Sequence, residues 1–217
     1  MKRPITSQGT PPDKIDIYDN LFDFVDDVLY QYKPSTSETG ENEITQDIEM
    51  SLNEESRVMD TCFAFQNQHK QGIYTTDIGV YLRSNRNIIC WMEAKRLPTP
   101  NEKYRDEHEY VYVSQEKING KKRFKGSGGI QRFKEGKHAP QLDFSIMIGY
   151  IQDDNTIDHW LSKINTWITD LANGNNGFWN DEDRLDKYVS NKCDRFLSIH
   201  KRIDKMPITL HHYWIKL

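Results

Sequence analysis

Residues 73–97 constrain the fold more than any other part of the chain, because they have the pattern of a β-hairpin. Two runs, 73–83 and 87–97, are rich in apolar, β-branched and aromatic residues. Residues 84–86 between them are turn-like. We therefore expect two antiparallel strands that belong to a larger sheet.

The register of this expected hairpin brings two carboxylates together. With the turn at 84–86, Arg83 faces Asn87, Val80 faces Cys90 and Asp77 faces Glu93. Opposed residues share a face of the sheet, with their Cβ atoms roughly 5 Å apart. Lys95 points to the same side as Glu93, because side chains alternate along a strand. Two acids and one base therefore converge.

Two carboxylates at this separation repel each other, and a bound cation relieves the repulsion. An all-oxygen site with few protein ligands suits Mg²⁺ or Mn²⁺, which also accept phosphate oxygens as ligands. The alternative is an exposed ladder of charges across two strands. The strands around Asp77 and Glu93 are too apolar for a solvated ribbon, so the metal site is the preferred interpretation. On this view, replacing either acid relieves repulsion and leaves thermal stability equal or raised.

Asp77 followed by Glu93-Ala94-Lys95 resembles the motif of the PD-(D/E)XK, or restriction-endonuclease-like, nuclease superfamily. The resemblance covers roughly residues 41–150, and Thr76 stands where the proline of the family name would be. It implies an α/β, restriction-endonuclease-like three-layer core with a mixed central β-sheet flanked by helices. It also implies that Asp77, Glu93 and the carbonyl of Ala94 hold Mg²⁺ while Lys95 places the attacking water.

In that family an acidic residue on the preceding helix often completes the site, and Glu41 and Glu43 are the candidates. Glu41 falls on the apolar stripe of Ile44 and Ile48 at helical spacing, whereas Glu43 lies near its edge. We therefore expect Glu41 to point toward the sheet. The alternative is that Glu41 is only a first-turn acid favoured by the helix dipole.

The segment 126–136 is the expected backbone-binding element. Glycines at 126, 128 and 129 open an expected helix, 130–135, that Gly136 closes. Free N–H groups at such a start attract phosphate. The candidate nucleic-acid-binding residues are Lys125, Gly128, Gly129, Gln131, Arg132 and Lys134, and Gln131 is also a candidate to face the metal site. The alternative is a flexible joint followed by a solvated basic face.

The size of the chain, 217 residues and 25.7 kDa, indicates one globular domain. We divide it into an N-terminal leader and helix, 1–40, and a nuclease-like domain, 41–217. The formal net charge is −4, which is unusual for a protein that binds phosphate. Residues 117–137 are nevertheless mostly basic while 13–60 are acidic, so one face can still be basic.

Other segments give the order of the remaining elements. We expect helices at 13–32 and 157–171, a first strand at 61–66, a buried central strand at 144–151 and a closing strand at 208–215, with 109–113 as a short strand or flap and 184–199 helical or mixed. Gly149 in the central strand would allow close approach of a neighbour. His211 and His212 are adjacent and point to opposite faces of a strand, which argues against a zinc site with His200.

These patterns predict Mg²⁺-dependent or Mn²⁺-dependent hydrolysis of a phosphodiester, with no membrane contact. The resemblance alone implies that the protein is an endonuclease that cleaves DNA. The three cysteines lack zinc or disulfide spacing, which indicates a reducing, cytoplasmic location. Without a recognition module, the chain is expected to be the cleaving part of a bacterial anti-phage defence assembly, with a protein partner or as a homo-oligomer. The alternatives are an RNA endonuclease with the same site and a non-catalytic nucleic-acid-binding or scaffold protein that retains the fold.

Overall fold

The computed structural model describes most of the chain. The described residues are 14–33, 40–71, 74–100, 105–113, 117–118, 121–122, 128–174, 177–190, 192–203 and 205–217. The helices are α1 (Lys14–Gln31), α2 (Glu41–Val58), α3 (Gly129–Lys134), α4 (Ile157–Asn173) and the 3₁₀ helix η1 (Asp181–Asp183). The strands are β1 (Phe63–Gln71), β2 (Tyr74–Leu82), β3 (Ile88–Leu97), β4 (Lys117–Ile118), β5 (Lys121–Lys122), β6 (Phe144–Ile151), β7 (Asp186–Tyr188), β8 (Asp194–Arg202) and β9 (Lys205–Lys216).

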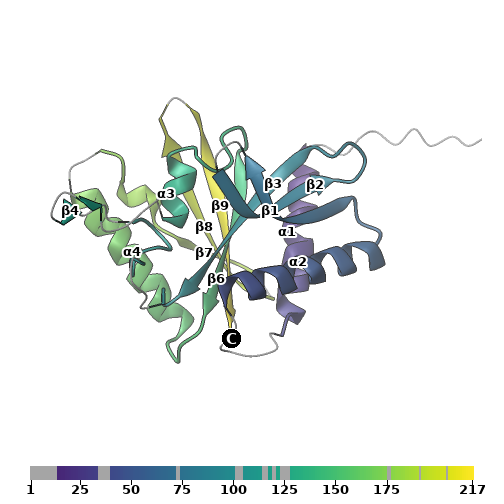
Figure 1. Cartoon of the computed structure of the whole chain (residues 1–217), viewed down its shortest axis with the longest axis horizontal. Helices are drawn as coiled ribbons and strands as arrows, with labels where there is room; N and C mark the ends of the chain where they lie inside the picture. The colour runs from purple at the N-terminus through teal and green to yellow at the C-terminus, as the bar shows by residue number, and fades with distance from the viewer. Residues whose placement is uncertain are drawn as a thin grey trace, which may run out of the picture.

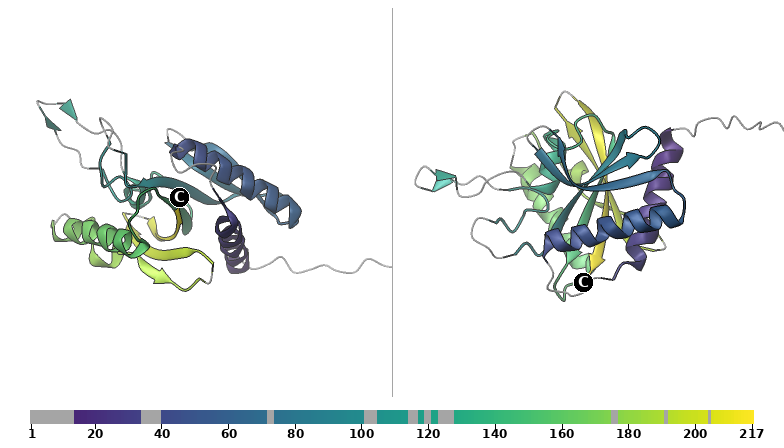
Figure 2. Two further views of the ribbon diagram at one scale, coloured as in Figure 1. Left: turned by 90° about the horizontal axis from the view of Figure 1, so that it is seen from below. Right: turned by 45° about the vertical axis from the view of Figure 1, so that its right-hand side comes forward.

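A seven-stranded mixed sheet in the order β1-β2-β3-β6-β9-β8-β7 forms the centre of the molecule. The middle strands β3, β6 and β9 are parallel, whereas the outer pairs β1–β2 and β8–β7 run antiparallel to their neighbours. Helices α1 and α2 cover one face, and α3 and α4 cover the other (Figures 1 and 2). The chain is therefore an α/β protein whose mixed sheet is flanked by helices.

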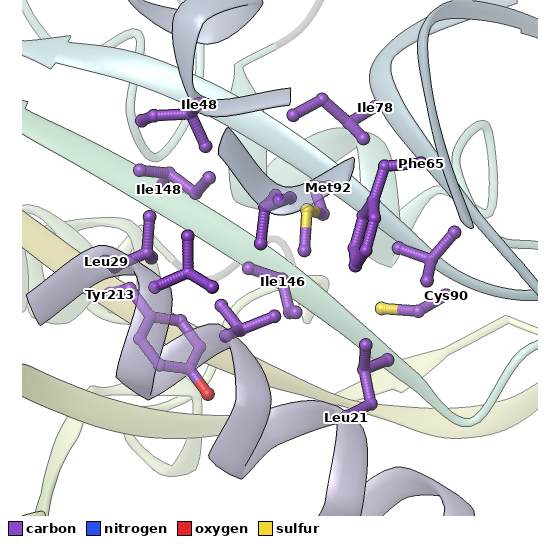
Figure 3. Close-up of a cluster of buried hydrophobic side chains, with 14 of the residues drawn as sticks. Leu21, Leu29, Ile48, Phe65, Ile78, Cys90, Met92, Ile146, Ile148 and Tyr213 are labelled. Carbon is purple, nitrogen blue, oxygen red and sulfur yellow. The ribbon is translucent and has the colours of Figure 1, made fainter. Parts of the chain in front are cut away.

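Two apolar cores lie on opposite faces of the sheet. The first core lies under α1 and α2 and includes Leu21, Ile48, Met92 and Ile146 (Figure 3). The second core lies under α3 and α4 and contains all five tryptophans, including Trp91. Full burial of each large apolar side chain contributes about 1.5–3 kcal/mol, so these cores fix the strand order.

The buried middle of the sheet explains its sequence. Strand β6 is almost wholly apolar because helices cover both of its faces. Gly149 is needed for close packing, since a Cβ atom there would lie 2.6 Å from Cδ1 of Trp214. The expectation of close approach at Gly149 is therefore confirmed.

Most of the expected elements are present. The helices expected at 13–32 and 157–171 and the strands expected at 61–66, 144–151 and 208–215 correspond to α1, α4, β1, β6 and β9. Asp13, proposed to begin the first helix, lies outside the described residues. Helix α1 packs into the same core as α2, so the segment before residue 41 contributes to that core.

The strand expected as one alternative at 109–113 and the helix expected as one alternative at 184–199 were wrong. Residues 109–113 form no strand; 107–111 is a turn whose carbonyls accept hydrogen bonds from α3. The described residues of 184–199 contain no helix; they follow η1 and supply β7 and most of β8. Buried and exposed residues alternate over 198–202 of β8, and this period of two is the signal of a strand. Among the described residues, no helix is both long and apolar enough to cross a membrane.

Candidate functional site

The β2–β3 hairpin sets the position of the two expected acids. Val80 pairs with Cys90 as expected, but a bulge follows and Tyr81 pairs with Ile88. The expected pairing of Arg83 with Asn87 was therefore wrong. The connection, residues 83–87, is longer than the expected three-residue turn, and Arg86 within it has φ 58°, in the left-handed region.

Asp77 and Glu93 nevertheless lie on one face of the sheet. On the hairpin side of Asp77 and Glu93, the three pairs from Val80–Cys90 to Ile78–Met92 keep the expected register. Ile78 and Met92 point into the first core, so alternation turns Asp77 and Glu93 to the opposite face. The carboxylate of Asp77 reaches across to β3, where Oδ2 accepts a hydrogen bond of 2.7 Å from the amide of Ala94.

Burial, followed by the charge of Glu93, raises the pKa of Asp77 to about 7. Lys95 and the amide of Ala94 oppose this shift but do not cancel it. A carboxyl group with this pKa exchanges a proton near neutral pH, which is the property of a general acid or base.

Glu93 is fully buried and binds two cations. Its Oε1 lies 2.5 Å from Nη1 of Arg132 and 2.9 Å from Nζ of Lys95. Burial would raise the pKa of Glu93, but the charges of Lys95 and Arg132 outweigh burial and lower it. Its Oε2 is buried, accepts no hydrogen bond from the described residues and lies 3.4 Å from Nδ1 of His138.

Lys95 joins the acidic groups of the site. Its Nζ donates a hydrogen bond of 2.7 Å to the carbonyl of Ala94 and lies 3.6 Å from Oε1 of Glu41. Burial alone would lower the pKa of Lys95, but the carboxylates of Glu93, Glu41 and Asp77 outweigh it and raise the pKa above its usual value. Lys95 therefore remains an ammonium ion at neutral pH.

Glu41, and not Glu43, lies beside this cluster. Oε2 of Glu41 accepts hydrogen bonds from the amide of Arg96, at 3.1 Å, and from Arg105, at 3.4 Å. Thr45, one turn later in α2, shares a hydrogen bond of 2.9 Å with Tyr150 of β6 and so fixes the start of the helix over the sheet. Glu43 is exposed, and its side chain accepts from the amide of Gly40 at the helix start.

The oxygen atoms of this cluster fit Mg²⁺ in chemical type, and the buried Oε2 of Glu93 has no hydrogen-bond partner among the described residues. In the described conformation, however, the protein's own cations hold Oε1 of Glu93 and the carbonyl of Ala94. No three His, Cys, Asp or Glu side chains in the described ranges are grouped closely enough to hold a metal ion. A metal ion would therefore compete with Lys95 or Arg132 for these oxygens.

The start of α3 does not present the free N–H groups that the sequence suggested. The amides of Gly129, Ile130 and Gln131 donate to the carbonyls of residues 109–111, and Gly128 and Gly129 are buried. The side chain of Gln131 accepts from Gly128 and Val113, so it caps the helix instead of facing the carboxylates. We therefore withdraw Gly128, Gly129 and Gln131 from the nucleic-acid-binding surface.

The basic residues of this segment separate into different environments. Lys134 is buried and binds both carboxylate oxygens of Asp183, at 2.8 and 2.9 Å, so we also withdraw it from that surface. Arg132 lies instead against Glu93. Lys125 lies outside the described residues.

Two members of the site were missed at the sequence level. His138 follows α3, and burial lowers its pKa to about 4, so it is neutral near Glu93 at pH 7. Arg105 bridges Glu41 and Glu109, at 3.4 and 2.6 Å. No local pattern marks either residue, because the fold brings them to the site from distant positions.

Comparison of the chain with protein-family models, curated proteins and solved structures finds no match. Its function is therefore argued from the site alone.

Proposed function

We propose that this protein is a metal-dependent nuclease that hydrolyses phosphodiester bonds in DNA, on a restriction-endonuclease-like core. The observation that carries the proposal is the convergence of Asp77, Glu93 and Lys95 from adjacent strands, with Glu41 beside them. Asp77, Glu93 and the carbonyl of Ala94 are the groups that would hold Mg²⁺ or Mn²⁺. A bound metal ion would polarise the phosphate and lower the pKa of a water molecule.

The protein's own residues supply the other requirements of hydrolysis. Lys95 stays protonated, so it orients the water and neutralises charge on the phosphate instead of acting as a base. Asp77 has a pKa of about 7 without a cation, and a metal ion bound there would hold it in the ionised form that a ligand must have. Arg132 can move from Glu93 to a phosphate oxygen, since guanidinium binds both anions well.

The test is cleavage of labelled DNA and RNA by wild-type protein and Lys95→Ala in Mg²⁺. We expect cleavage of DNA to fall by about 10²–10³-fold in Lys95→Ala, because a charge-stabilising donor is lost. Lys201→Ala is the matched control, since Lys201 is exposed and pairs only with Glu182 among the described residues. Preferred cleavage of RNA would change the substrate. Equal retention of nucleic acid by both proteins, with no cleavage by either, would favour the scaffold alternative.

We also propose that the nuclease is the effector of a larger bacterial defence assembly in the cytoplasm. The sequence contains no helix-turn-helix or zinc-finger pattern that would select a target. A monomer that is active and sequence-specific in gel-filtration fractions would contradict this proposal.

A further inference from the structure

The three strands β1, β2 and β3 have a charge composition unlike that of the rest of the chain. Within residues 63–97 the only acidic residues are Asp77 and Glu93, both in the candidate site. The basic residues there are Lys70, Arg83, Arg86, Lys95 and Arg96. This segment is therefore positive in a chain whose net charge is −4, as expected of a surface that binds phosphate.

One face of β1 and β2 is covered by α2, and the other is in part exposed among the described residues. Helix α2 packs on the face that carries Phe65 and Val80 in the first core. On the opposite face, Gln66 is exposed and Tyr81 is half-buried. Helix α3 lies further along the sheet, against β3 and β8 (Figure 1).

A hollow of about 500 Å³ lies at the hairpin end of this region, lined in part by Ala64, Gln66, Tyr81, Arg83 and Arg86. This volume is in the range of small-ligand pockets. Arg83 is held by the fold, since it donates to the carbonyl of Phe63, at 2.6 Å, and to Ser56, at 3.1 Å. Arg86 is exposed in the loop and is the cation that can reach an incoming anion.

An aromatic ring, an amide and a guanidinium together match a nucleotide. A base stacks on Tyr81, Gln66 offers hydrogen bonds to a base edge, and Arg86 offers charge to a phosphate. Only an unpaired strand presents the face of a base for stacking, so the ligand chemistry is that of a single strand.

Tyr81, in the lining of the hollow, lies on the same face of β2 as Asp77, since the two residues are four positions apart. The four residue steps from Asp77 to Tyr81 span about 13 Å. A stacked strand advances about 3.4 Å per nucleotide and an extended strand more, so this distance is roughly two to four nucleotides. We propose that the hollow binds a nucleotide of single-stranded nucleic acid, roughly two to four positions from the phosphate at Asp77 and Glu93. This inference rests on the proposed nuclease function.

Fluorescence anisotropy in EDTA tests binding without cleavage, with a labelled twelve-nucleotide oligothymidylate as the probe. We expect Tyr81→Ala to weaken binding by about 5-fold to 100-fold, the range of one lost base stack, while Tyr81→Phe stays within about 3-fold of wild type. Arg86→Asn, which suits the left-handed φ of that position, should weaken binding and reduce the salt dependence by about one phosphate contact. Tyr30→Ala and Arg184→Asn are matched controls at exposed positions outside the lining of the hollow and should bind as wild type.

The outcomes separate this inference from the proposed function. Wild-type cleavage with unchanged binding by Tyr81→Ala and Arg86→Asn would reject the hollow and leave the nuclease intact. A wild-type protein that neither cleaves in Mg²⁺ nor binds the oligonucleotide would reject both. Circular dichroism checks that each variant is folded, and if Tyr81→Ala is not, Arg86→Asn in the exposed loop decides the result.

Discussion

Two buried polar groups on the same face of the sheet differ in how completely their charges and hydrogen bonds are satisfied. The first, the Glu93 cluster, comprises Glu41, Asp77, Glu93, Lys95 and Arg132. The second, the Asp183 chain, comprises Lys134, Asp183, His200, Ser198, His212, Tyr110 and Trp214. Glu93 and His212 lie in one row across the sheet, separated by the apolar Met147.

The hydrogen bonds of the Asp183 chain run in a single direction. Trp214 donates to Tyr110, Tyr110 to His212, His212 to Ser198, Ser198 to His200 and His200 to Asp183, over distances of 2.7–2.9 Å. The indole at one end can only donate, and the carboxylate at the other end can only accept, so the direction is fixed. Burial lowers the pKa of both histidines, and their neutral forms match each donor with an acceptor.

The Glu93 cluster lacks this match. It has three acids, Glu41, Asp77 and Glu93, but only two cations, Lys95 and Arg132. The pKa of Asp77 is raised to about 7, and Oε2 of Glu93 has no hydrogen bond among the described residues. A satisfied buried network stabilises a fold, whereas perturbed and unsatisfied groups are typical of sites that bind ligands. We therefore expect substitutions in the Asp183 chain to change mainly the stability of the fold, and substitutions in the Glu93 cluster to change mainly the cleavage activity.

The largest effect is expected for Asp183→Asn. Asparagine keeps an oxygen to accept from His200 but removes the charge that pairs with buried Lys134. We expect the free energy of unfolding to fall by about 3–5 kcal/mol, as when one partner of a buried ion pair is lost. Urea unfolding at pH 7 measures it.

Asp181→Asn is the matched control, because Asp181 is an exposed residue of the same 3₁₀ helix. It should change the free energy of unfolding by less than about 0.5 kcal/mol. A loss below about 1 kcal/mol for Asp183→Asn would mean that the chain is not the more stabilising of the two groups.

The two acids of the Glu93 cluster should respond with opposite signs. Glu93→Gln removes the carboxylate that holds Lys95 and Arg132, so we expect a loss of about 2–4 kcal/mol. Asp77→Asn keeps an oxygen for the amide of Ala94 and removes a crowded charge, so we expect equal or raised stability. The sequence led us to expect that replacing either acid relieves repulsion. The contacts of Glu93 reverse this expectation for Glu93 but not for Asp77. Both variants should lose cleavage.

The pH dependence of the stability difference between wild type and Asp77→Asn tests whether the charge of Asp77 destabilises the fold. The folded protein holds the proton of Asp77 up to pH about 7, whereas the unfolded chain loses it near the usual aspartate pKa of 3.8. Wild-type protein should therefore lose stability relative to Asp77→Asn as pH rises from 4 to 7, by about 1–2 kcal/mol for a partly exposed carboxyl. A difference that stays constant over pH 4–8 in thermal unfolding would contradict the raised pKa.

The elements of the fold and the central acids could be predicted from the sequence because their signals are local. Alternation along β2 and β3 places Asp77, Glu93 and Lys95, and helical spacing selects Glu41 over Glu43. The partner of Lys134 could not be predicted, since Asp183 comes from a distant 3₁₀ helix. For the same reason Arg132 and Lys134 looked equivalent in the sequence, although Arg132 belongs to the Glu93 cluster and Lys134 to the Asp183 chain.

The bulge and the turn at 107–111 were missed for a different reason. A bulge at Val80 and Tyr81 changes the register by one residue without changing the apolar pattern. Residues 109–113 are rich in Tyr and Val, which favour strands, but the carbonyls of 109–111 accept hydrogen bonds from the amides of α3 instead of from a strand. Tertiary hydrogen bonds decide such segments, and they leave no mark on local composition.

The smallest effect that separates the two groups is expected for Arg132→Ala, measured as binding of Mn²⁺. Arg132 and a metal ion would compete for Oε1 of Glu93, which Arg132 holds at 2.5 Å. Removing the guanidinium should tighten Mn²⁺ binding by about 10-fold, equivalent to about 1.4 kcal/mol, in isothermal titration calorimetry. Arg184→Ala, an exposed control, should bind as wild type. Weaker Mn²⁺ binding by Arg132→Ala would instead mean that Arg132 supports the site, and Lys95 would then be the cation that the metal ion must displace.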